Sequence, residues 1–280
     1  MKVLMTADTV GGVWTYALEL TRAMPEIDFV LATMGPAPSS TQAADLPPNV
    51  KLVNGDFKLE WMDDPWRDVV SAGAWLLDLE SREAPDLVHL NGYAHGALPF
   101  SAPKIVVAHS CVISWWRAVK SEEAPPEWNT YRETVTRGLA GADLVVAPSA
   151  WMLGALDEHY KFATRRKLIY NGRSSPWRTG ASPVLSDDSE ADRRGRLSST
   201  RNSVFAAGRM WDEAKNLRAV ADAAPHINAE VRIAGDGSPL GRLDEQRMAW
   251  AYAESAIYLF PALYEPFGLS ILEAALAGFD

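Results

Sequence analysis

Short apolar runs alternate with helical patterns along most of the chain. A strand buried inside a parallel sheet is covered on both faces, so it appears in the sequence as a continuous apolar run. Such runs predict strands over Val3–Ala7, Phe29–Ala32, Leu87–Leu90, Ile105–Ala108, Leu144–Ala147 and Lys167–Tyr170. Helices are predicted over Val13–Met24, Asp64–Arg82 and Trp128–Ala140. This alternation predicts an α/β fold built on a parallel sheet.

The pattern stops at a polar stretch and then starts again. Residues 173–202 are rich in Ser, Asp, Arg, Pro and Gly, which predicts an interdomain linker. Further strands are predicted over Val204–Ala207, Val231–Ala234 and Ile257–Phe260, and helices over Asn216–Ala223 and Glu245–Glu254. We therefore expect a first domain over 1–172, the linker over 173–202 and a smaller α/β domain over 203–280. A ligand is expected at the carboxyl ends of the strands, in a cleft between the domains.

Composition narrows the class of protein. A net charge of −9 over 280 residues argues against nucleic acid as the main partner. Cys111 is the only cysteine, which fits a reducing compartment. The chain begins directly with a strand and has no apolar run near the length of a membrane helix, so we expect a cytoplasmic protein. Nothing in the sequence supports a peripheral membrane contact, and no common metal-binding pattern is found, so we expect no metal site.

Two carboxylates, Glu265 and Glu273, lie near the C-terminus on either side of Gly268. The glycine lets the backbone approach a ligand, and the helix expected after it aims N–H groups at an anion. Carboxylates beside such an anion site suit a ligand that is both sugar and phosphate, because sugar hydroxyls donate hydrogen bonds to them. Glu273 has a second interpretation, since Ser270 and Glu273 have the spacing of a helix capping box. Glu265, held extended by the following proline, is the better candidate for the reacting centre.

Other polar residues follow predicted strands, and each has two interpretations. Gly11-Gly12, between a strand and a helix, form either a phosphate-binding loop or a plain tight turn. Arg209 and Lys215 either neutralise a diphosphate or are solvated surface charges. His109 either serves the ligand side of the sheet or is a structural residue at a strand end.

Taken in order, these residues resemble the retaining glycosyltransferases of family 4, which have two Rossmann-like domains facing each other across a cleft in the GT-B arrangement. The resemblance covers nearly the whole chain. It rests on Gly11-Gly12, His109, Tyr170-Asn171-Gly172, Gly208-Arg209, Lys215-Asn216 and the Glu-x7-Glu motif of Glu265 and Glu273. It implies an enzyme that moves a sugar from a nucleotide-diphosphate-sugar to a carbohydrate or small-molecule acceptor, retaining the anomeric configuration and using no metal or other cofactor.

The resemblance also implies a role for each residue. The implied catalytic residues are Glu265, His109, Arg209 and Lys215. The implied donor-binding residues are Gly11, Gly12, Arg209, Lys215, Phe267, Gly268, Leu269 and Glu273. Among these, the two cations bind the diphosphate, Glu273 holds the ribose, and His109 contacts the sugar near the reacting carbon. The acceptor is expected over Trp14, Tyr93, Trp115 or Trp116 of the first domain.

The chain departs from the family at its C-terminus. In the family, further strands and helices follow the Glu-x7-Glu helix, whereas this sequence ends at Asp280. We therefore expect a truncated chain with an incomplete second domain, poor stability or weak activity. Two other functions stay open: a nucleotide-sugar epimerase on the same architecture, and a non-catalytic nucleotide-sugar-binding module. The sequence does not distinguish the sugar, the base or the acceptor.

Overall fold

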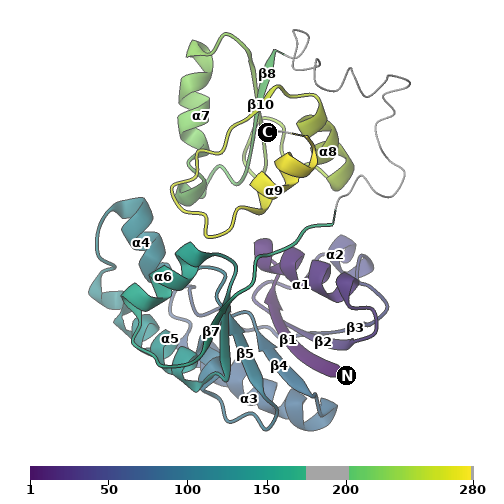
Figure 1. The fold of residues 1–280 in the computed structure, drawn as a ribbon, viewed down its shortest axis with the longest axis vertical. Helices are drawn as coiled ribbons and strands as arrows, with labels where there is room; N and C mark the ends of the chain where they lie inside the picture. The colour runs from purple at the N-terminus through teal and green to yellow at the C-terminus, as the bar shows by residue number, and fades with distance from the viewer. Residues whose placement is uncertain (175–201, 279–280) are drawn as a thin grey trace. The chain divides into compact units, whose positions relative to one another are not determined.

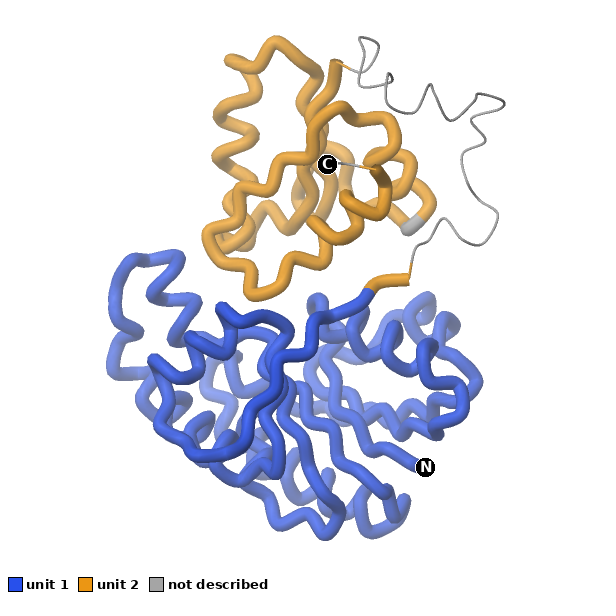
Figure 2. Tube along the Cα trace, in the orientation of Figure 1, with its two compact units in different colours: residues 1–172 blue, residues 173–280 orange. Residues whose placement is uncertain are grey.

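The computed structural model describes residues 1–174 and 202–278 of the chain. The chain separates into two compact units, unit 1 over Met1–Gly172 and unit 2 over Arg173–Asp280 (Figures 1 and 2). The predicted linker over 173–202 falls for most of its length on 175–201, outside the described residues.

Unit 1 is built on a seven-stranded sheet with strand order β3-β2-β1-β4-β5-β6-β7. All of its neighbouring strands are parallel, as the apolar runs predict. The strands are β1 (Lys2–Asp8), β2 (Asp28–Met34), β3 (Val50–Asn54), β4 (Leu87–Leu90), β5 (Lys104–Val107), β6 (Leu144–Ala147) and β7 (Arg166–Leu168). The order reverses at β1, which pairs with both β2 and β4, so the loops after β1 and β4 diverge at this point.

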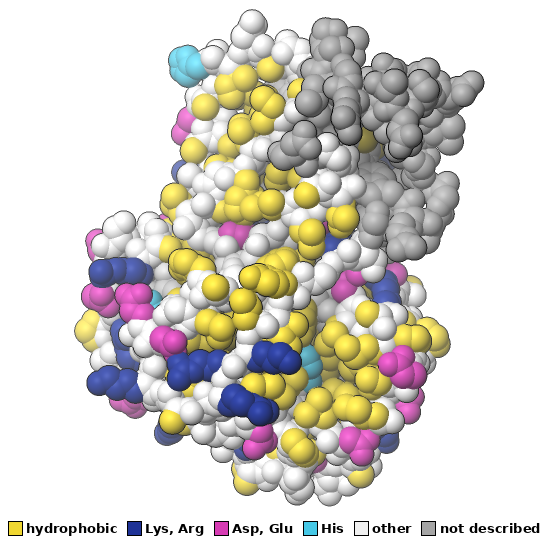
Figure 3. Space-filling view, in the orientation of Figure 1, with side chains coloured by type: hydrophobic (Ala, Val, Ile, Leu, Met, Phe, Trp, Pro, Cys, Tyr) yellow, Lys and Arg dark blue, Asp and Glu magenta, His cyan; other side chains and the backbone are white. Residues whose placement is uncertain are grey.

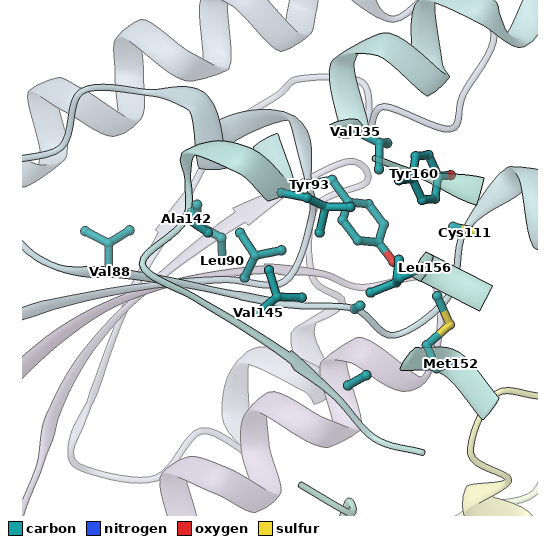
Figure 4. Close-up of a cluster of buried hydrophobic side chains, with 14 of the residues drawn as sticks. Val88, Leu90, Tyr93, Cys111, Val135, Ala142, Val145, Met152, Leu156 and Tyr160 are labelled. Carbon is teal, nitrogen blue, oxygen red and sulfur yellow. The ribbon is translucent and has the colours of Figure 1, made fainter. Parts of the chain in front are cut away.

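Helices cover both faces of this sheet (Figure 1). They are α1 (Gly12–Ala23), α2 (Ser40–Ala44), α3 (Trp66–Glu83), α4 (Val112–Lys120), α5 (Asn129–Gly141) and α6 (Ala150–His159). Successive residues of β1 point to opposite faces. Met5 packs with Leu18 of α1, whereas Leu4 packs in the cluster of Leu76 of α3 and Leu139 of α5. Figure 4 shows part of this second, larger cluster, whose labelled side chains come from strands and helices alike.

Unit 2 has a smaller parallel sheet in the order β10-β8-β9. Its strands are β8 (Ser203–Ala207), β9 (Glu230–Ala234) and β10 (Ile257–Tyr258), and its helices are α7 (Leu217–Ala223), α8 (Glu245–Ala253) and α9 (Leu269–Leu276). On one face, the fully buried ring of Phe205 meets Tyr252 of α8 edge-on, with centroids 5.2 Å apart. On the other face, Leu217 and Val220 of α7 pack against Ala206. Unit 2 therefore has a core of its own.

The predicted strands are present, with ends that differ by at most two residues. Strand β7 stops at Leu168, before Tyr170, and β10 stops at Tyr258, before Phe260. Among the α-helices and strands of the described residues, α2, β3, α4 and α6 were not predicted from the sequence. Strand β3 lies at the edge of the sheet and has no fully buried residue, so it lacks the continuous apolar run of the inner strands.

The surface carries charges of both signs. Basic and acidic side chains are interspersed over the visible face of unit 1 (Figure 3). Among the described residues, none of the helices has the length and apolar character needed to span a bilayer.

Two glycines allow a backbone-to-backbone approach beside the end of β4. The short helix η1 (Ala94–Ala97) follows β4 and lies against α5. A Cβ atom on Gly138 of α5 would lie 1.8 Å from the carbonyl oxygen of Tyr93, and one on Gly96 would lie 2.3 Å from that of Gly138. No side chain fits there, because the obstacle is backbone rather than a movable side chain.

We expect Gly138→Ala to destabilise the protein by about 2–3 kcal/mol, since the added methyl group must push η1 away from α5. Gly154→Ala is the matched control within α6, because a Cβ atom at that exposed position meets no atom within 4 Å. It should stabilise the protein by about 0.5–1 kcal/mol through helix propensity. Urea unfolding of both variants checks this, and equal effects in the two would contradict the close approach.

Candidate functional site

The loop between β1 and α1 places Gly11 and Gly12 at a helix N-terminus. Gly11 is the N-cap of α1, and the helix begins at Gly12, one residue before the predicted start. Asp8 closes the loop by accepting a hydrogen bond from the N–H of Val10 at 2.9 Å. The first N–H groups of an α-helix have no partner within the helix, so this end of α1 is a site with positive potential.

A cluster of four polar side chains lies at the carboxyl ends of β4 and β5, next to α1. Asn91 directly follows β4, and its Oδ1 lies 2.9 Å from Nε2 of His109 and 3.2 Å from Nε2 of His89. The ring of Tyr16, from α1, meets that of His109 edge-on at 4.6 Å, and its hydroxyl lies 3.4 Å from Nε2 of His89. Sequence reasoning identified His109 but not its three neighbours.

Burial keeps these groups uncharged. Desolvation lowers the pKa of His109 to about 3, and the neighbouring His89 adds to this effect. Desolvation likewise lowers the pKa of His89 to about 4, although its hydrogen bond to Asn91 acts in the opposite direction. Burial raises the pKa of Tyr16 to about 12. At neutral pH the cluster is therefore a network of dipoles with no net charge.

Glu60 is a further residue that sequence reasoning missed. Its carboxylate accepts hydrogen bonds from the N–H of Tyr93 at 3.0 Å and of Ala94 at 2.7 Å. Burial raises the pKa of Glu60, and the two amide hydrogen bonds partly offset this. The residue fastens the segment between β3 and α3 to the end of β4.

In unit 2, the structure brings Lys215 and Glu265 together although they lie 50 residues apart. Lys215 ends the short helix η4 (Glu213–Lys215), and its Nζ donates to Oε2 of Glu265. The loop after β10 is fastened to η4 by its backbone, since the N–H of Leu263 donates to the carbonyl of Ala214 at 2.9 Å. Both charged side chains are about a quarter exposed or less, so water screens the pair only in part.

Arg209, which follows β8, has a different anionic partner. Its guanidinium lies 2.5 Å from Oδ2 of Asp212 and sits over the ring of Trp211, 5.1 Å from the centroid. Asp212 also caps η4 through the N–H of Ala214. The side chain of Lys215 passes close to Gly208, where an added Cβ would lie 3.4 Å from Cβ of Lys215. Arg209 and Lys215 thus lie on either side of one turn, and they contact Asp212 and Glu265 respectively.

The segment between Glu265 and α9 is organised by Gly268. This glycine is the N-cap of α9 with a φ of +87°, a conformation that side chains disfavour, and the helix begins at Leu269. Its N–H donates to Oε1 of Glu265 at 3.3 Å. The predicted capping box of Ser270 and Glu273 is wrong, because the helix begins before Ser270 and its N-cap makes no side-chain hydrogen bond.

Glu273 lies within α9, and its Oε1 accepts a hydrogen bond from Nε of Arg173 at 3.0 Å. Both side chains are largely buried, at 24% and 14% exposed. This contact joins α9 to the start of unit 2. Glu265 and Glu273 therefore have different partners, Lys215 and Arg173.

Two of the predicted acceptor contacts are wrong. Trp14 is 7% exposed and Tyr93 is 3% exposed, and both belong to hydrophobic clusters of unit 1, so neither offers a ring face to a sugar. His95 is also buried, where its Nε2 lies 3.0 Å from the carbonyl oxygen of Val69. Across residues 1–174 and 202–278, no group of three or more His, Cys, Asp or Glu side chains is placed to hold a metal ion.

Comparisons with known proteins agree with this architecture. The sequence pattern of Glycosyltransferase Family 4 matches residues 10–174, which is more than half of the chain. Comparison with curated proteins gives no match.

Solved structures of glycosyltransferases share the fold. Sucrose-phosphate synthase from Thermosynechococcus elongatus is 16% identical with a TM-score of 0.71, and the match covers 99% of this chain and 79% of that one. A glycosyltransferase from Rickettsia africae ESF-5 is 15% identical with a TM-score of 0.67, covering 99% and 77%. The trehalose-6-phosphate synthase OtsA is 12% identical with a TM-score of 0.63, covering 99% and 82%. The fold class is thus that of the GT-B glycosyltransferases.

The neutral histidines predict a loss of stability in acid. In the folded protein His89 stays neutral down to about pH 4, whereas in the unfolded chain it takes up a proton near the ordinary histidine pKa of 6.5. The unfolded state therefore binds more protons below pH 6.5. The free energy of unfolding should fall as the pH drops from 6.5 towards 4, and should be fully restored above 6.5.

We expect His89→Gln to make this loss shallower between pH 7 and pH 5, a range in which most carboxylates stay ionised. Thermal melts over a pH series measure the slope. His226→Gln is the control, because His226 is exposed. An unchanged slope in His89→Gln would contradict the buried, neutral state of His89.

Proposed function

The chain belongs to glycosyltransferase family 4, and we propose that it transfers a sugar from a nucleotide-diphosphate-sugar to a carbohydrate or small-molecule acceptor, with retention of the anomeric configuration. The observation that carries this proposal is the pairing of Lys215 with Glu265 at the turn that also holds Arg209. Two cations and a carboxylate at one turn provide partners for a diphosphate and for sugar hydroxyls. The family and the fold support sugar transfer as the class of reaction. The proposal of a nucleotide-diphosphate-sugar as donor rests on the side chains of Lys215, Glu265 and Arg209.

The donor diphosphate is assigned to Arg209 and Lys215. Each of these cations contacts a carboxylate, Asp212 for Arg209 and Glu265 for Lys215. A diphosphate offers more negative charge and several acceptor oxygens, so it replaces these partners with a gain in electrostatic energy. Glu265, released from Lys215, then accepts hydrogen bonds from the sugar. The backbone from Phe267 to Leu269 lies beside it at the start of α9.

The transfer step needs no covalent enzyme intermediate. The bond between the anomeric carbon and the diphosphate oxygen breaks, and the acceptor hydroxyl oxygen bonds to the same carbon from the same face. The hydroxyl proton passes to the leaving phosphate oxygen. Arg209 and Lys215 stabilise the negative charge that grows on the diphosphate, and on this proposal they supply the role of a divalent metal. Transfer should therefore survive a metal chelator.

We assign roles to three further features, namely Glu273, the start of α1 and His109. Glu273 is assigned to the ribose hydroxyls. To bind them, its carboxylate must either release Arg173 or accept hydrogen bonds from Arg173 and the ribose together. The anion-binding element of unit 1 is the start of α1 at Gly11 and Gly12. His109 is assigned to the sugar. The buried single cysteine, Cys111, fits a cytoplasmic location, which we also propose.

A panel of nucleotide-sugars tests the reaction. One member should raise the melting temperature through binding to the folded state, and with an acceptor mixture it should give nucleoside diphosphate and an extended acceptor. Conversion of the donor into an epimer without an acceptor would indicate an epimerase instead. Binding with no product from any acceptor would indicate a non-catalytic module. Release of sugar with inverted configuration would contradict retention.

A double-mutant cycle separates the function of Lys215 and Glu265 from their contribution to folding. Each single change, Lys215→Gln or Glu265→Gln, leaves a partly buried charge without its partner and should cost on the order of 1–2 kcal/mol. Lys215→Gln/Glu265→Gln removes both charges and should regain most of that stability.

Transfer should behave differently from stability. We expect about a 100-fold loss in each single variant and no recovery in the double variant, because the diphosphate and the sugar each lose a partner. Asp222→Asn, an exposed acid of α7, is the control and should keep normal rates. Recovery of both activity and stability in the double variant would show that the pair is only structural.

A further inference from the structure

The amide of Asn91 has one defined orientation. Its side-chain nitrogen lies 2.7 Å from the carbonyl oxygen of Thr6, and its backbone N–H donates to Oγ1 of Thr6 at 2.9 Å. A carbonyl oxygen only accepts hydrogen bonds, so the amide atom facing it must be the NH₂ group. The amide oxygen, Oδ1, therefore faces the two histidines.

This orientation fixes the tautomer of His109. The amide oxygen only accepts, and Nε2 of His109 lies 2.9 Å from it, so Nε2 must carry the proton. A neutral imidazole has one proton, so Nδ1 is left with a lone pair and can only accept. The ring is thus a defined acceptor rather than a rotating or charged group.

The acceptor nitrogen is available to a ligand. Within the described residues, the ring of His109 makes its one hydrogen bond to Asn91. His109 is partly exposed, and its Nδ1 makes no hydrogen bond to the described residues. The ring of Tyr16 packs edge-on against the imidazole, with 4.6 Å between the ring centroids.

We propose that Asn91 is a positioning residue that holds His109 as the Nε2–H tautomer, so that Nδ1 accepts a hydrogen bond from a substrate hydroxyl. The tautomer is inferred from the hydrogen-bond geometry, whereas the substrate hydroxyl as its partner rests on the proposed function. A ring of this kind binds a sugar hydroxyl and rejects a phosphate oxygen, because Nδ1 has no proton to donate. It assigns His109 to the sugar and leaves the phosphates to other groups.

The surroundings of His109 support a neutral ring. The titratable groups that face it are Tyr16 from α1 and His89 from β4. Burial raises the pKa of Tyr16 to about 12, so it brings no negative charge, and His89 disfavours a positive one. A carboxylate at position 91 would reverse this balance by favouring the imidazolium form.

The tautomer is tested directly by NMR on the full chain. The ¹⁵N shifts of the imidazole distinguish protonated from unprotonated ring nitrogens, and loss of the signal in His109→Gln assigns it. We expect protonated Nε2 and unprotonated Nδ1 from pH 6 to pH 8. A proton on Nδ1, or an imidazolium in this range, would overturn the proposal. This measurement needs no substrate, so it stands or fails separately from the proposed function.

The link to the hydroxyl is tested by the pH dependence of transfer in Asn91→Asp. The wild type should show no ionisation of His109 in kcat/KM between about pH 4.5 and pH 8, because the pKa of this ring is about 3. In the variant, the new carboxylate should raise the pKa of His109 by about 1–3 units, so its ionisation should enter the lower part of this range. Protonation then removes the acceptor, so kcat/KM should drop about tenfold for each pH unit below the new pKa.

Asn54→Asp is the control, because Asn54 is the last residue of β3 and its Oδ1 accepts a hydrogen bond from Oγ1 of Thr33, away from His109 in the sequence and on another strand. It should keep the flat wild-type profile. A flat profile in Asn91→Asp, with the variant folded, would contradict the role of Nδ1 in transfer. If the variant does not fold, the NMR measurement on the wild type decides the tautomer. The pH dependence of kcat/KM of the wild type then decides whether His109 acts as a neutral ring.

Discussion

The structure of unit 1 depends on the parallel pairing of β1 with β2 on one side and β4 on the other. Parallel strands end at the same edge of a sheet, so the residues that follow β1, β4 and β5 meet there whatever their distance in sequence. That edge receives Gly11, Asn91 and His109. The burial of both sheet faces under helices leaves this edge as the place where polar side chains and free backbone N–H groups collect. The chemistry of the unit follows from its topology.

Unit 2 differs from unit 1 because its candidate site contains charged side chains in pairs. Three of its candidate ligand-binding side chains, Lys215, Arg209 and Glu273, each contact a side chain of opposite charge. A partly buried ion without a partner costs on the order of 1–2 kcal/mol, so these pairs stabilise the fold around the turn. On the proposed function, a diphosphate bound by Arg209 and Lys215 therefore replaces the carboxylates that these two cations contact. Affinity then depends on the difference between a diphosphate and a carboxylate as partners, which favours a ligand of high charge over a neutral sugar.

The sequence predicts the inner strands because burial on both faces leaves an apolar run with no interruption. It does not predict β3, an edge strand whose residues are only partly buried or exposed. In the same way, His109 could be predicted as a strand-end residue, but Asn91 could not, because an asparagine after a strand looks like any turn residue. The pairing of Lys215 with Glu265 arises from backbone contacts between η4 and the loop after β10, which no local pattern records. The capping-box prediction failed because Gly268, with its positive φ, starts α9 before Ser270.

The two units therefore offer different kinds of recognition, and the difference has a physical origin. The cluster of unit 1 lies among buried strand ends, where a charge would be poorly solvated, so its hydrogen bonds are made by neutral groups whose direction is fixed. Neutral, oriented acceptors discriminate hydroxyl positions but bind anions weakly. The turn of unit 2 is more exposed and tolerates full charges in pairs. Hydroxyl groups are therefore the partners that suit the cluster of unit 1, and anionic groups are the partners that suit the turn of unit 2.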